Sequence, residues 1–285
     1  MEPTSAAAQS GAAASQSTAV EFDQVSLAFD EHVVLRDLSF SLPAGAMRIL
    51  LGASGSGKSV VLKLILGLLR PDAGTIVVNG QRVDTMAERD LLRMRVDIGM
   101  VFQENALFDS LTVGENVGYR LYEDGDLTGD QVRVRVEEVL SFIGLSEMID
   151  RMPASLSGGQ RRRVAIARAM APKPGLLLFD DPITGLDPLI ATTVDDEIVK
   201  LRDLEHVTSL LVTHQIRDAF YIATHEAVRR NGQVQIEDAG AARAEQVEFM
   251  VLLDGRIHFQ GTAAELQASP DAYLKEYLLM TLPPW

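Results

Sequence analysis

The stretch Gly52-Ala-Ser-Gly-Ser-Gly-Lys58-Ser59 constrains this chain more than any other, because it fits the phosphate-binding pattern G-x-x-x-x-G-K-S/T. It follows the apolar run Met47–Leu51, and apolar residues continue after it from Val60 to Leu69. This order predicts a buried strand, a loop whose backbone N–H groups wrap phosphates, and a buried helix that ends at Arg70-Pro71. Lys58 is expected to hold the outer phosphates and Ser59 to bind Mg²⁺. The predicted nucleotide contacts are Gly52, Ala53, Ser54, Gly55, Ser56, Gly57, Lys58 and Ser59.

Further apolar segments extend this unit into an α/β fold. Residues 175–179 and 208–212 have the pattern of fully buried strands, with a helix over residues 190–204 between them. Strands that alternate with helices form parallel sheets, which bind ligands beyond the carboxyl ends of their strands. Asn-Gly at 231–232 and Asp-Gly at 254–255 each predict a hairpin.

Composition excludes several classes of protein. With 26 Lys and Arg against 40 Asp and Glu, the net charge is -14, so we expect no nucleic-acid partner. The chain has no cysteine, which rules out disulfides and thiolate metal sites. The longest apolar run is interrupted by Lys63 and is too short to span a membrane, for which about 20 residues are needed. Residues 1–19 are rich in Ala and Ser and predict a disordered tail rather than a secretory signal.

Two more motifs add to the predicted chemistry. Asp180 ends the apolar strand 176–179, where a carboxylate can hold Mg²⁺; the alternative role is an aspartate that caps a helix. Residues Ser157, Gly158, Gly159 and Gln160 precede a helical pattern over residues 161–170. Ser157 can cap that helix, and the two glycines allow its amino end to approach a phosphate closely, although a plain capped helix after a loop is the alternative.

These motifs together resemble those of the ATP-binding subunit of ABC transporters, over nearly all of residues 20–261. The resemblance implies an α/β P-loop NTPase of ABC type: a mainly parallel sheet core, an N-terminal antiparallel β subdomain and an inserted helical subdomain at about 104–170. It places the nucleotide-binding domain at 20–265. It further implies ATP and Mg²⁺ as cofactors, a homodimer whose signature reaches the γ-phosphate held by the other subunit, integral-membrane permease subunits, and a cytoplasmic position on the inner face of the inner membrane.

The resemblance also assigns roles to single residues. Phe29 matches an aromatic residue that stacks on adenine, the alternative being a phenylalanine of the core. Gln103 matches a glutamine that contacts Mg²⁺ and the attacking water and senses the membrane partner. Asp187, within Gly185-Leu-Asp187-Pro188, matches a loop that communicates across the dimer, and His214 matches a histidine that contacts the γ-phosphate.

The residue after Asp180 departs from the family, which usually has glutamate there to polarise the attacking water. This chain has Asp181, which keeps the carboxylate and shortens its reach by one methylene. Either Asp181 serves as the base after a small adjustment of backbone or water, or hydrolysis is slow and ATP holds the dimer together as a non-hydrolysing clamp. The first is favoured because Gln103, His214 and the signature are all present.

Residues 102–123, with the run Ala-Leu-Phe-Asp-Ser-Leu-Thr-Val, look like the corresponding stretch in ATPases of Mla/Mce-type phospholipid transporters. That resemblance implies lipid as cargo and an Mce-domain lipid-binding partner. Phe108, Leu111 and Val113 would then contact a short helix of the permease, or belong to the core of the helical subdomain. The alternative cargo is a small polar solute such as an amino acid. A DNA- or ribosome-clamping ABC protein is disfavoured, because the chain has neither a long coiled coil nor a second nucleotide domain.

Two C-terminal segments lie outside the family pattern. Residues 226–247 look like an insertion, a solvated loop being the simplest expectation and a docking or regulatory element the alternative. Residues 266–285 predict a C-terminal helical tail that ends at Pro283-Pro284 and includes the single tryptophan, Trp285. This tail packs either on its own domain or on its dimer mate.

Overall fold

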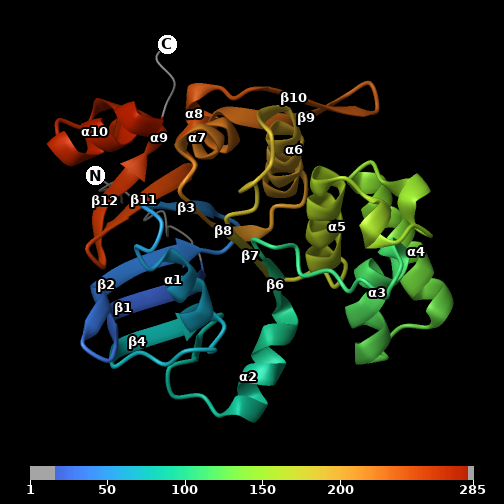
Figure 1. Ribbon diagram of the computed structural model, residues 1–285, viewed down its shortest axis with the longest axis horizontal. Helices are drawn as coiled ribbons and strands as arrows, with labels where there is room; N and C mark the ends of the chain where they lie inside the picture. Colours follow the sequence, from blue (N-terminus) through green and yellow to red (C-terminus); the bar gives the residue numbers. More distant parts are fainter. Residues whose placement is uncertain (1–16, 282–285) are drawn as a thin grey trace, which may run out of the picture.

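The strand that leads into the phosphate loop lies inside a six-stranded sheet (Figure 1). The computed structural model describes residues 17–281. The sheet has the order β12-β11-β3-β8-β7-β6, and its strands are parallel apart from β12, which pairs antiparallel with β11. Its strands are β3 (Met47–Leu51), β6 (Ile98–Val101), β7 (Leu176–Asp180), β8 (Thr208–Thr213), β11 (Val247–Leu253) and β12 (Arg256–Thr262).

A second sheet, antiparallel, is built from the N-terminal part of the chain. Its order is β2-β1-β4-β5, with β1 at Thr18–Phe29, β2 at His32–Pro43, β4 at Ala73–Val78 and β5 at Gln81–Arg82. Phe22 and Phe40 face each other across β1 and β2, and their rings stack at 4.7 Å. Asn79 and Gly80 both have positive φ, as a two-residue hairpin turn requires. This sheet is the expected β subdomain.

The helices begin and end where local signals place them. Four helices start with a capping box, in which a Ser or Thr side chain and a Glu or Gln three residues later satisfy each other's backbone N–H groups. The helices are α1 (Lys58–Ile65), α2 (Glu88–Met94), α3 (Val113–Asp124), α4 (Gly129–Phe142), α5 (Gly158–Met170), α6 (Pro188–Leu204), α7 (Ile216–Thr224), α8 (Ala241–Ala244), α9 (Ala263–Ala268) and α10 (Ala272–Thr281).

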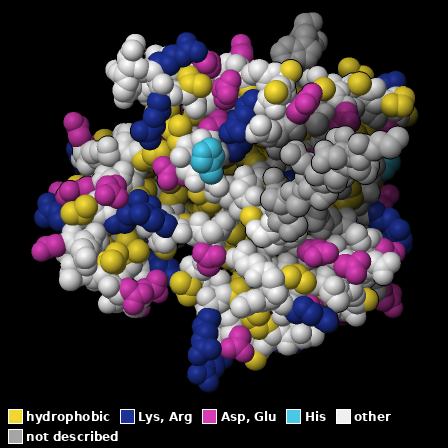
Figure 2. Space-filling model, turned by 180° about the vertical axis from the view of Figure 1, so that it is seen from behind, with side chains coloured by type: hydrophobic (Ala, Val, Ile, Leu, Met, Phe, Trp, Pro, Cys, Tyr) yellow, Lys and Arg dark blue, Asp and Glu magenta, His cyan; other side chains and the backbone are white. Residues whose placement is uncertain are grey.

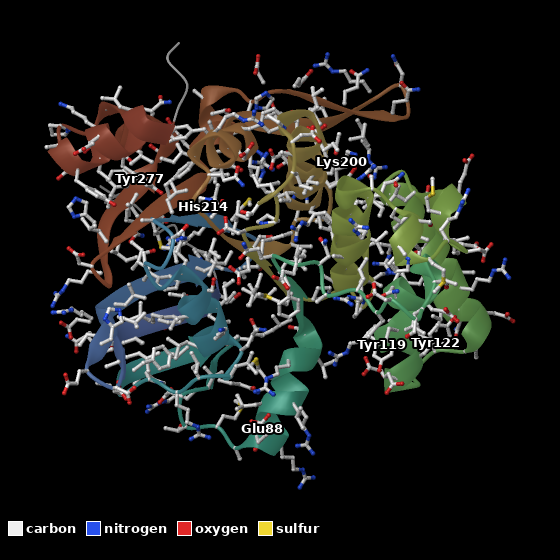
Figure 3. The ribbon with its side chains drawn as sticks, in the orientation of Figure 1. Glu88, Tyr119, Tyr122, Lys200, His214 and Tyr277 are labelled. Carbon is white, nitrogen blue, oxygen red and sulfur yellow. The ribbon has the colours of Figure 1, made fainter. Side chains whose placement is uncertain are left out.

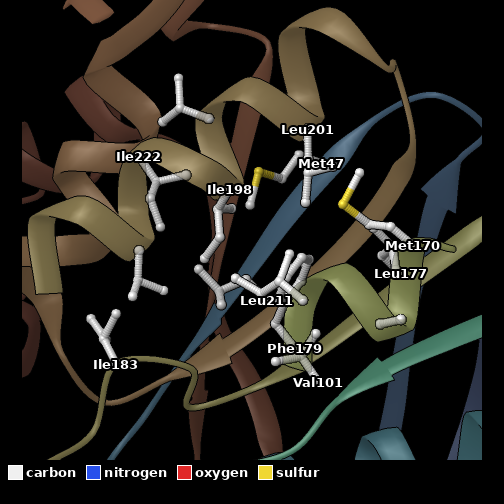
Figure 4. Packing of buried hydrophobic residues seen from close by; sticks show 14 of the residues in the cluster. Met47, Val101, Met170, Leu177, Phe179, Ile183, Ile198, Leu201, Leu211 and Ile222 are labelled. Carbon is white, nitrogen blue, oxygen red and sulfur yellow. The ribbon is translucent and has the colours of Figure 1, made fainter. Parts of the chain in front are cut away.

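Side chains from the two faces of the parallel sheet enter two separate apolar clusters. Leu178 and Leu210 point into the cluster between this sheet, α1 and the antiparallel sheet. Leu177, Phe179 and Leu211 point the other way and pack with residues of α5 and α6 (Figure 4). Successive residues of a strand point to opposite faces, so a strand buried on both faces is apolar throughout. The sheet is thus fixed from both sides, and the phosphate loop begins at its edge.

Several boundaries differ from the sequence prediction. The helix predicted to reach Leu69 ends at Ile65, because Gly67 adopts φ +62° and the next N–H groups turn back to the Lys63 carbonyl. Strand β1 begins at Thr18, so the tail predicted for 1–19 is wrong at its end, and residues 1–16 lie outside the described residues. Strand β6 and helix α2 were not predicted.

The segment 226–247 is ordered, contrary to the simplest expectation of a solvated loop. Strands β9 (His225–Arg230) and β10 (Gln233–Asp238) form a hairpin, and α8 follows. The carboxylate of Asp203, at the end of α6, accepts a hydrogen bond from the backbone N–H of Ala227 at 2.8 Å. The side chain of Arg202 donates to the carbonyl of His225 at 2.6 Å. The hairpin is therefore docked on α6.

The C-terminal helix packs on its own domain, which answers the question the sequence left open. Leu274 and Leu278 of α10 are buried in the cluster that also contains residues of α7 and α9. Residues 282–285, with Trp285, lie outside the described residues. No helix between residues 17 and 281 is long and apolar enough to cross a membrane. On the face seen in Figure 2, acidic side chains lie interspersed with basic ones.

Candidate functional site

The phosphate loop connects the last residue of β3 to the first residue of α1. Gly52 has no room for a side chain, because a Cβ there would lie 2.7 Å from the Ser56 hydroxyl and 2.8 Å from the Leu252 carbonyl. Gly57 precedes the helix with φ +102°, a conformation that side chains disfavour. Small residues are therefore required at both ends of the loop by its own packing. Its backbone N–H groups lie at a helix N-terminus, which favours phosphate.

Lys58 folds back over this loop. Its Nζ donates hydrogen bonds to the carbonyls of Gly52 at 2.8 Å and Ala53 at 3.0 Å. Burial lowers the pKa of Lys58, while the nearby carboxylates of Asp181 and Asp180 act in the opposite direction. The lysine is thus held beside the loop as a cation that anionic phosphates would attract more strongly than two carbonyl groups do.

Asp180 and Ser59 meet although they are far apart in the sequence. The Ser59 hydroxyl donates to Oδ1 of Asp180 at 2.8 Å. Burial raises the pKa of Asp180, an effect that the hydrogen bond from Ser59 opposes. A partly buried carboxylate beside a hydroxyl is the oxygen pair that Mg²⁺ binds next to nucleotide phosphates.

Asp181 is held by the end of the neighbouring strand β8. Its Oδ1 accepts hydrogen bonds from the Thr213 hydroxyl at 2.8 Å and from the backbone N–H of His214 at 3.2 Å. Nδ1 of His214 lies 3.1 Å from both carboxylate oxygens. The backbone of Asp181 has φ +44°, a left-handed conformation that aspartate tolerates better than most residues. Asp181 and His214, predicted separately, thus form one pair.

Gln103 follows β6 and is fixed through its backbone. Arg162, on α5, donates one guanidinium N–H to the carbonyl of Phe102 at 2.6 Å and another to the carbonyl of Gln103 at 2.5 Å. Burial lowers the pKa of Arg162 to about 10, and the charge of Asp181 acts in the opposite direction. Arg162 therefore connects the backbone at Gln103 with the surroundings of Asp181.

The signature residues start α5 and pack on the start of α6. Ser157 caps α5, and its partner in the capping box is Gln160. A Cβ on Gly159 would lie 2.2 Å from Cγ2 of Ile190, so this glycine is required for the close approach of the two helices. Asp187 caps α6 by accepting from the N–H of Ile190 at 3.1 Å. The structure thus places the signature beside the Asp187 loop.

Phe29 lies at the end of β1 and is 46% exposed, so it is not the core phenylalanine that was the alternative. The turn after it and the start of β2 border a cavity of about 710 Å³. Residues 53–56 of the phosphate loop form another wall, and Tyr273 of α10 completes the lining. Phe29 itself is not among the lining residues, and its exposed ring lies just before them in the chain.

Two arginines of α5 are functional candidates that sequence reasoning missed. Arg162 was read as part of a helical pattern, and so was Arg168, which donates to the carbonyl of Ala106 at 2.6 Å and lies over the ring of Phe108 at 5.7 Å. Both hold the segment between β6 and α3. Their spacing of six residues was visible, but nothing in the sequence showed which segment faces them.

Comparison with known proteins agrees with this geometry. A family model described as ABC transporter matches residues 35–184, which is more than half of the chain. The chain belongs to the ABC transporter family. The sulfate/thiosulfate import ATP-binding protein CysA of Synechococcus elongatus is 40% identical over 216 residues, which are 76% of this chain and 61% of that protein. The Fe(3+) ions import ATP-binding protein FbpC of Photorhabdus laumondii is 39% identical over 77% of this chain and 61% of that protein.

A third relative of this ABC protein covers more of the chain. The Arabidopsis thaliana chloroplastic protein named TRIGALACTOSYLDIACYLGLYCEROL 3 is 33% identical over 90% of this chain and 72% of its own length. Among solved structures, the dimeric post-hydrolysis state of the ATP-binding cassette MJ0796 bound to ADP and Pi matches with a TM-score of 0.69 and 28% identity, over 85% of this chain and 98% of that one. The chain spans about three fifths of the length of the CysA and FbpC relatives. The predicted fold class is confirmed.

Proposed function

We propose that this chain is the ATP-hydrolysing subunit of an ABC transporter and works as a homodimer beneath a pair of permease subunits. The observation that carries the proposal is the pair Asp181 and His214, whose carboxylate is fixed by three donors beside the phosphate loop and Lys58. A carboxylate in such a position can accept a proton from water that attacks the γ-phosphate. The pairing of the signature with the Asp187 loop supports the head-to-tail dimer implied by the family.

The residues present fit ATP with Mg²⁺. The loop offers backbone N–H groups, Lys58 offers a cation, and Ser59 with Asp180 offers two oxygen ligands, to which Gln103 would add a third. Within residues 17–281 no three His, Asp or Glu side chains cluster so as to hold a metal ion, which suits an ion held chiefly by phosphate oxygens. Mg²⁺ bound there would neutralise charge that develops on the phosphates.

This chain's own residues account for the remaining steps. Lys58 would exchange the carbonyls of Gly52 and Ala53 for phosphate oxygens. Thr213 and His214 keep the Asp181 carboxylate in one orientation, so the shorter side chain loses less to disorder than a free aspartate would. Asp181 would take the proton of the attacking water, and the His214 ring beside it would face the γ-phosphate.

Substitution of the base tests this assignment. In the complex purified with its membrane partners, we expect Asp181→Asn to bind ATP but to lose turnover by about 10²- to 10⁴-fold, the usual contribution of a general base. Asp238→Asn, at a largely exposed carboxylate on β10, is the control and should turn over like the natural sequence. Unchanged turnover in Asp181→Asn would remove this residue from the role of base. No turnover in the natural complex would instead favour the non-hydrolysing clamp.

A groove between the two parts of the cassette is the proposed permease site. A cavity of about 510 Å³ lies between the end of β6 and α3 and is lined mainly by apolar side chains, with Arg168 among them. Phe108 is 42% exposed there, and its ring packs on Tyr119 at 4.6 Å. Val113 is fully buried, so of the apolar residues predicted for this surface it belongs to the core. A short amphipathic permease helix would fit the groove.

The cargo is better supported as a small ion or polar solute than as a lipid, the first expectation from sequence. The relatives of 38–40% identity are import ATP-binding proteins whose names specify sulfate, thiosulfate or Fe(3+). One observation keeps lipid as a second candidate: the match that extends over 90% of the chain is to a protein named after a diacylglycerol lipid.

The membrane partners distinguish the two cargoes. Purification of the complex from its native membrane, followed by identification of the proteins bound to it, is the decisive experiment. A soluble solute receptor, together with ATP-dependent uptake of sulfate or ferric ion, would establish the importer. An Mce-domain protein with bound phospholipid would establish lipid transport instead.

A further inference from the structure

The C-terminal helix α10 carries two tyrosines that the proposed function does not use. Tyr273 and Tyr277 lie one turn apart, so they share a face of the helix, and their rings stack at 5.9 Å with an interplanar angle of 7°. Leu274 and Leu278 lie next to them and are buried in the core. Figure 3 shows Tyr277 on the side of α10 that faces the sheet. The leucines thus fix the helix so that the tyrosines face the nucleotide site.

Tyr277 contacts the first residue of the phosphate loop. Burial raises the pKa of the Tyr277 phenol, and a hydrogen bond from the backbone of Gly52 opposes that rise. The Gly52 carbonyl is one of the two that hold Lys58, at 2.8 Å. The same peptide segment is therefore bound on one side by α10 and on the other by the lysine that must turn toward the phosphates.

Tyr273 lies in the wall of the cavity that the phosphate loop borders. The lining of about 710 Å³ includes residues 53–56 of the loop and Tyr273. The ring of His258, on β12, meets the edge of Tyr273 at 5.5 Å, and Nε2 of His258 lies 3.3 Å from the carboxylate of Asp271. Asp271 accepts from the N–H of Leu274 at 2.9 Å and so caps α10. The start of α10 is thereby attached to the sheet beside the cavity.

From this arrangement we propose that Tyr277 is a positioning residue of the phosphate loop, through which docking of α10 and binding of nucleotide stabilise each other. Tyr277 holds the Gly52 end of the loop in its bound shape when Lys58 leaves the Gly52 carbonyl for phosphate. Because coupling between two equilibria is reciprocal, nucleotide that favours this loop shape must also favour the docked helix. The inference rests on ATP binding at this loop.

Two measurements on the full-length chain test the coupling. Tyr277→Phe keeps the stacked ring and removes the hydroxyl, so the dissociation constant for ATP should rise by about three- to tenfold, the range for one lost hydrogen bond, with the melting temperature nearly unchanged. In the natural sequence, ATP should slow amide hydrogen exchange in residues 272–279, and Tyr277→Phe should reduce that protection.

Control variants separate the possible failures. Tyr221→Phe removes a phenol that donates to Asp196 at 2.8 Å on another helix, and should leave the ATP dissociation constant unchanged. Lys58→Ala should abolish ATP binding; if it does not, the nucleotide site itself is misassigned. If Lys58→Ala abolishes binding while Tyr277→Phe binds ATP within twofold of the natural sequence, only the role of Tyr277 is refuted. Exchange in α10 that ATP does not alter would refute it as well.

Discussion

Asp195, buried between α6 and α7, should make the stability of this protein fall as the pH rises. Its side chain is fully buried, and within the described residues no donor reaches either of its carboxylate oxygens. Asp218, on α7, is its neighbour and receives the guanidinium of Arg217 at 2.9 Å. Burial, together with repulsion from Asp218, raises the pKa of Asp195 to about 9. A protonated Asp195 can donate to Asp218, which is the arrangement that two buried carboxyl groups favour.

The sign and the size of the effect follow from proton linkage. The pKa of Asp195 is raised in the folded state above its ordinary value of 3.8, so between about pH 4 and pH 9 the folded state binds one more proton than the unfolded state. The free energy of unfolding then decreases by about 1.4 kcal/mol for each pH unit in this window. From pH 5 to pH 8 this one group removes about 4 kcal/mol of stability.

Asp195→Asn replaces the carboxyl with a neutral amide of similar shape that can still donate to Asp218. Urea unfolding followed by circular dichroism at pH 5, 6, 7 and 8 would give the free energy of unfolding of both proteins. We expect the variant to gain on the natural sequence by about one proton equivalent of slope, so that the difference grows toward pH 8. Asp126→Asn, at an exposed carboxylate, should run parallel to the natural sequence. Parallel curves for Asp195→Asn would mean that Asp195 is ionised in the folded protein, and would refute the reasoning.

Two further predictions concern the nucleotide site. Arg162→Lys leaves one ammonium where two guanidinium N–H groups held the carbonyls of Phe102 and Gln103, so ATP turnover of the complex should drop by about tenfold, as for one lost charged hydrogen bond; turnover equal to that of Arg161→Lys would contradict it. Phe29→Ala removes a half-exposed ring, so the melting temperature should hardly change while the dissociation constant of a fluorescent ATP analogue rises at least fivefold, the lower limit for base stacking. Tight binding by this variant would exclude stacking.

Local signals were sufficient for much of the fold. The apolar strand before Gly52, the Asn79-Gly80 turn and the Ser157 cap each depend on residues that are neighbours in the chain, and the structure has each of them. The helix after Ser59 was predicted too long because its apolar pattern continues past Gly67, whose positive φ ends it. Strand β6 was missed because it has four residues and a glycine within it.

The parts that could not be predicted depend on contacts between distant segments. Nothing in the run Arg161-Arg-Arg163 indicates that only the middle guanidinium reaches back about 60 residues to Gln103. The docking of residues 226–238 depends on Asp203 at the end of another helix, and the position of Tyr277 depends on α10 packing on the sheet. Asp181 could be named from its place after a strand, but its three donors could not, because they come from a different strand.

Helix α5 has a mechanical consequence through its two arginines. Arg168 lines the groove proposed for the permease, and Arg162 lies near Asp181, six residues or about 9 Å away along the same helix. A helix is stiff over this length, so a push at the groove displaces both guanidinium groups together and without delay. The transporter then needs no relay of side chains between cargo and ATP: α5 acts as a short rod, and the carbonyl groups gripped at its two ends move with it.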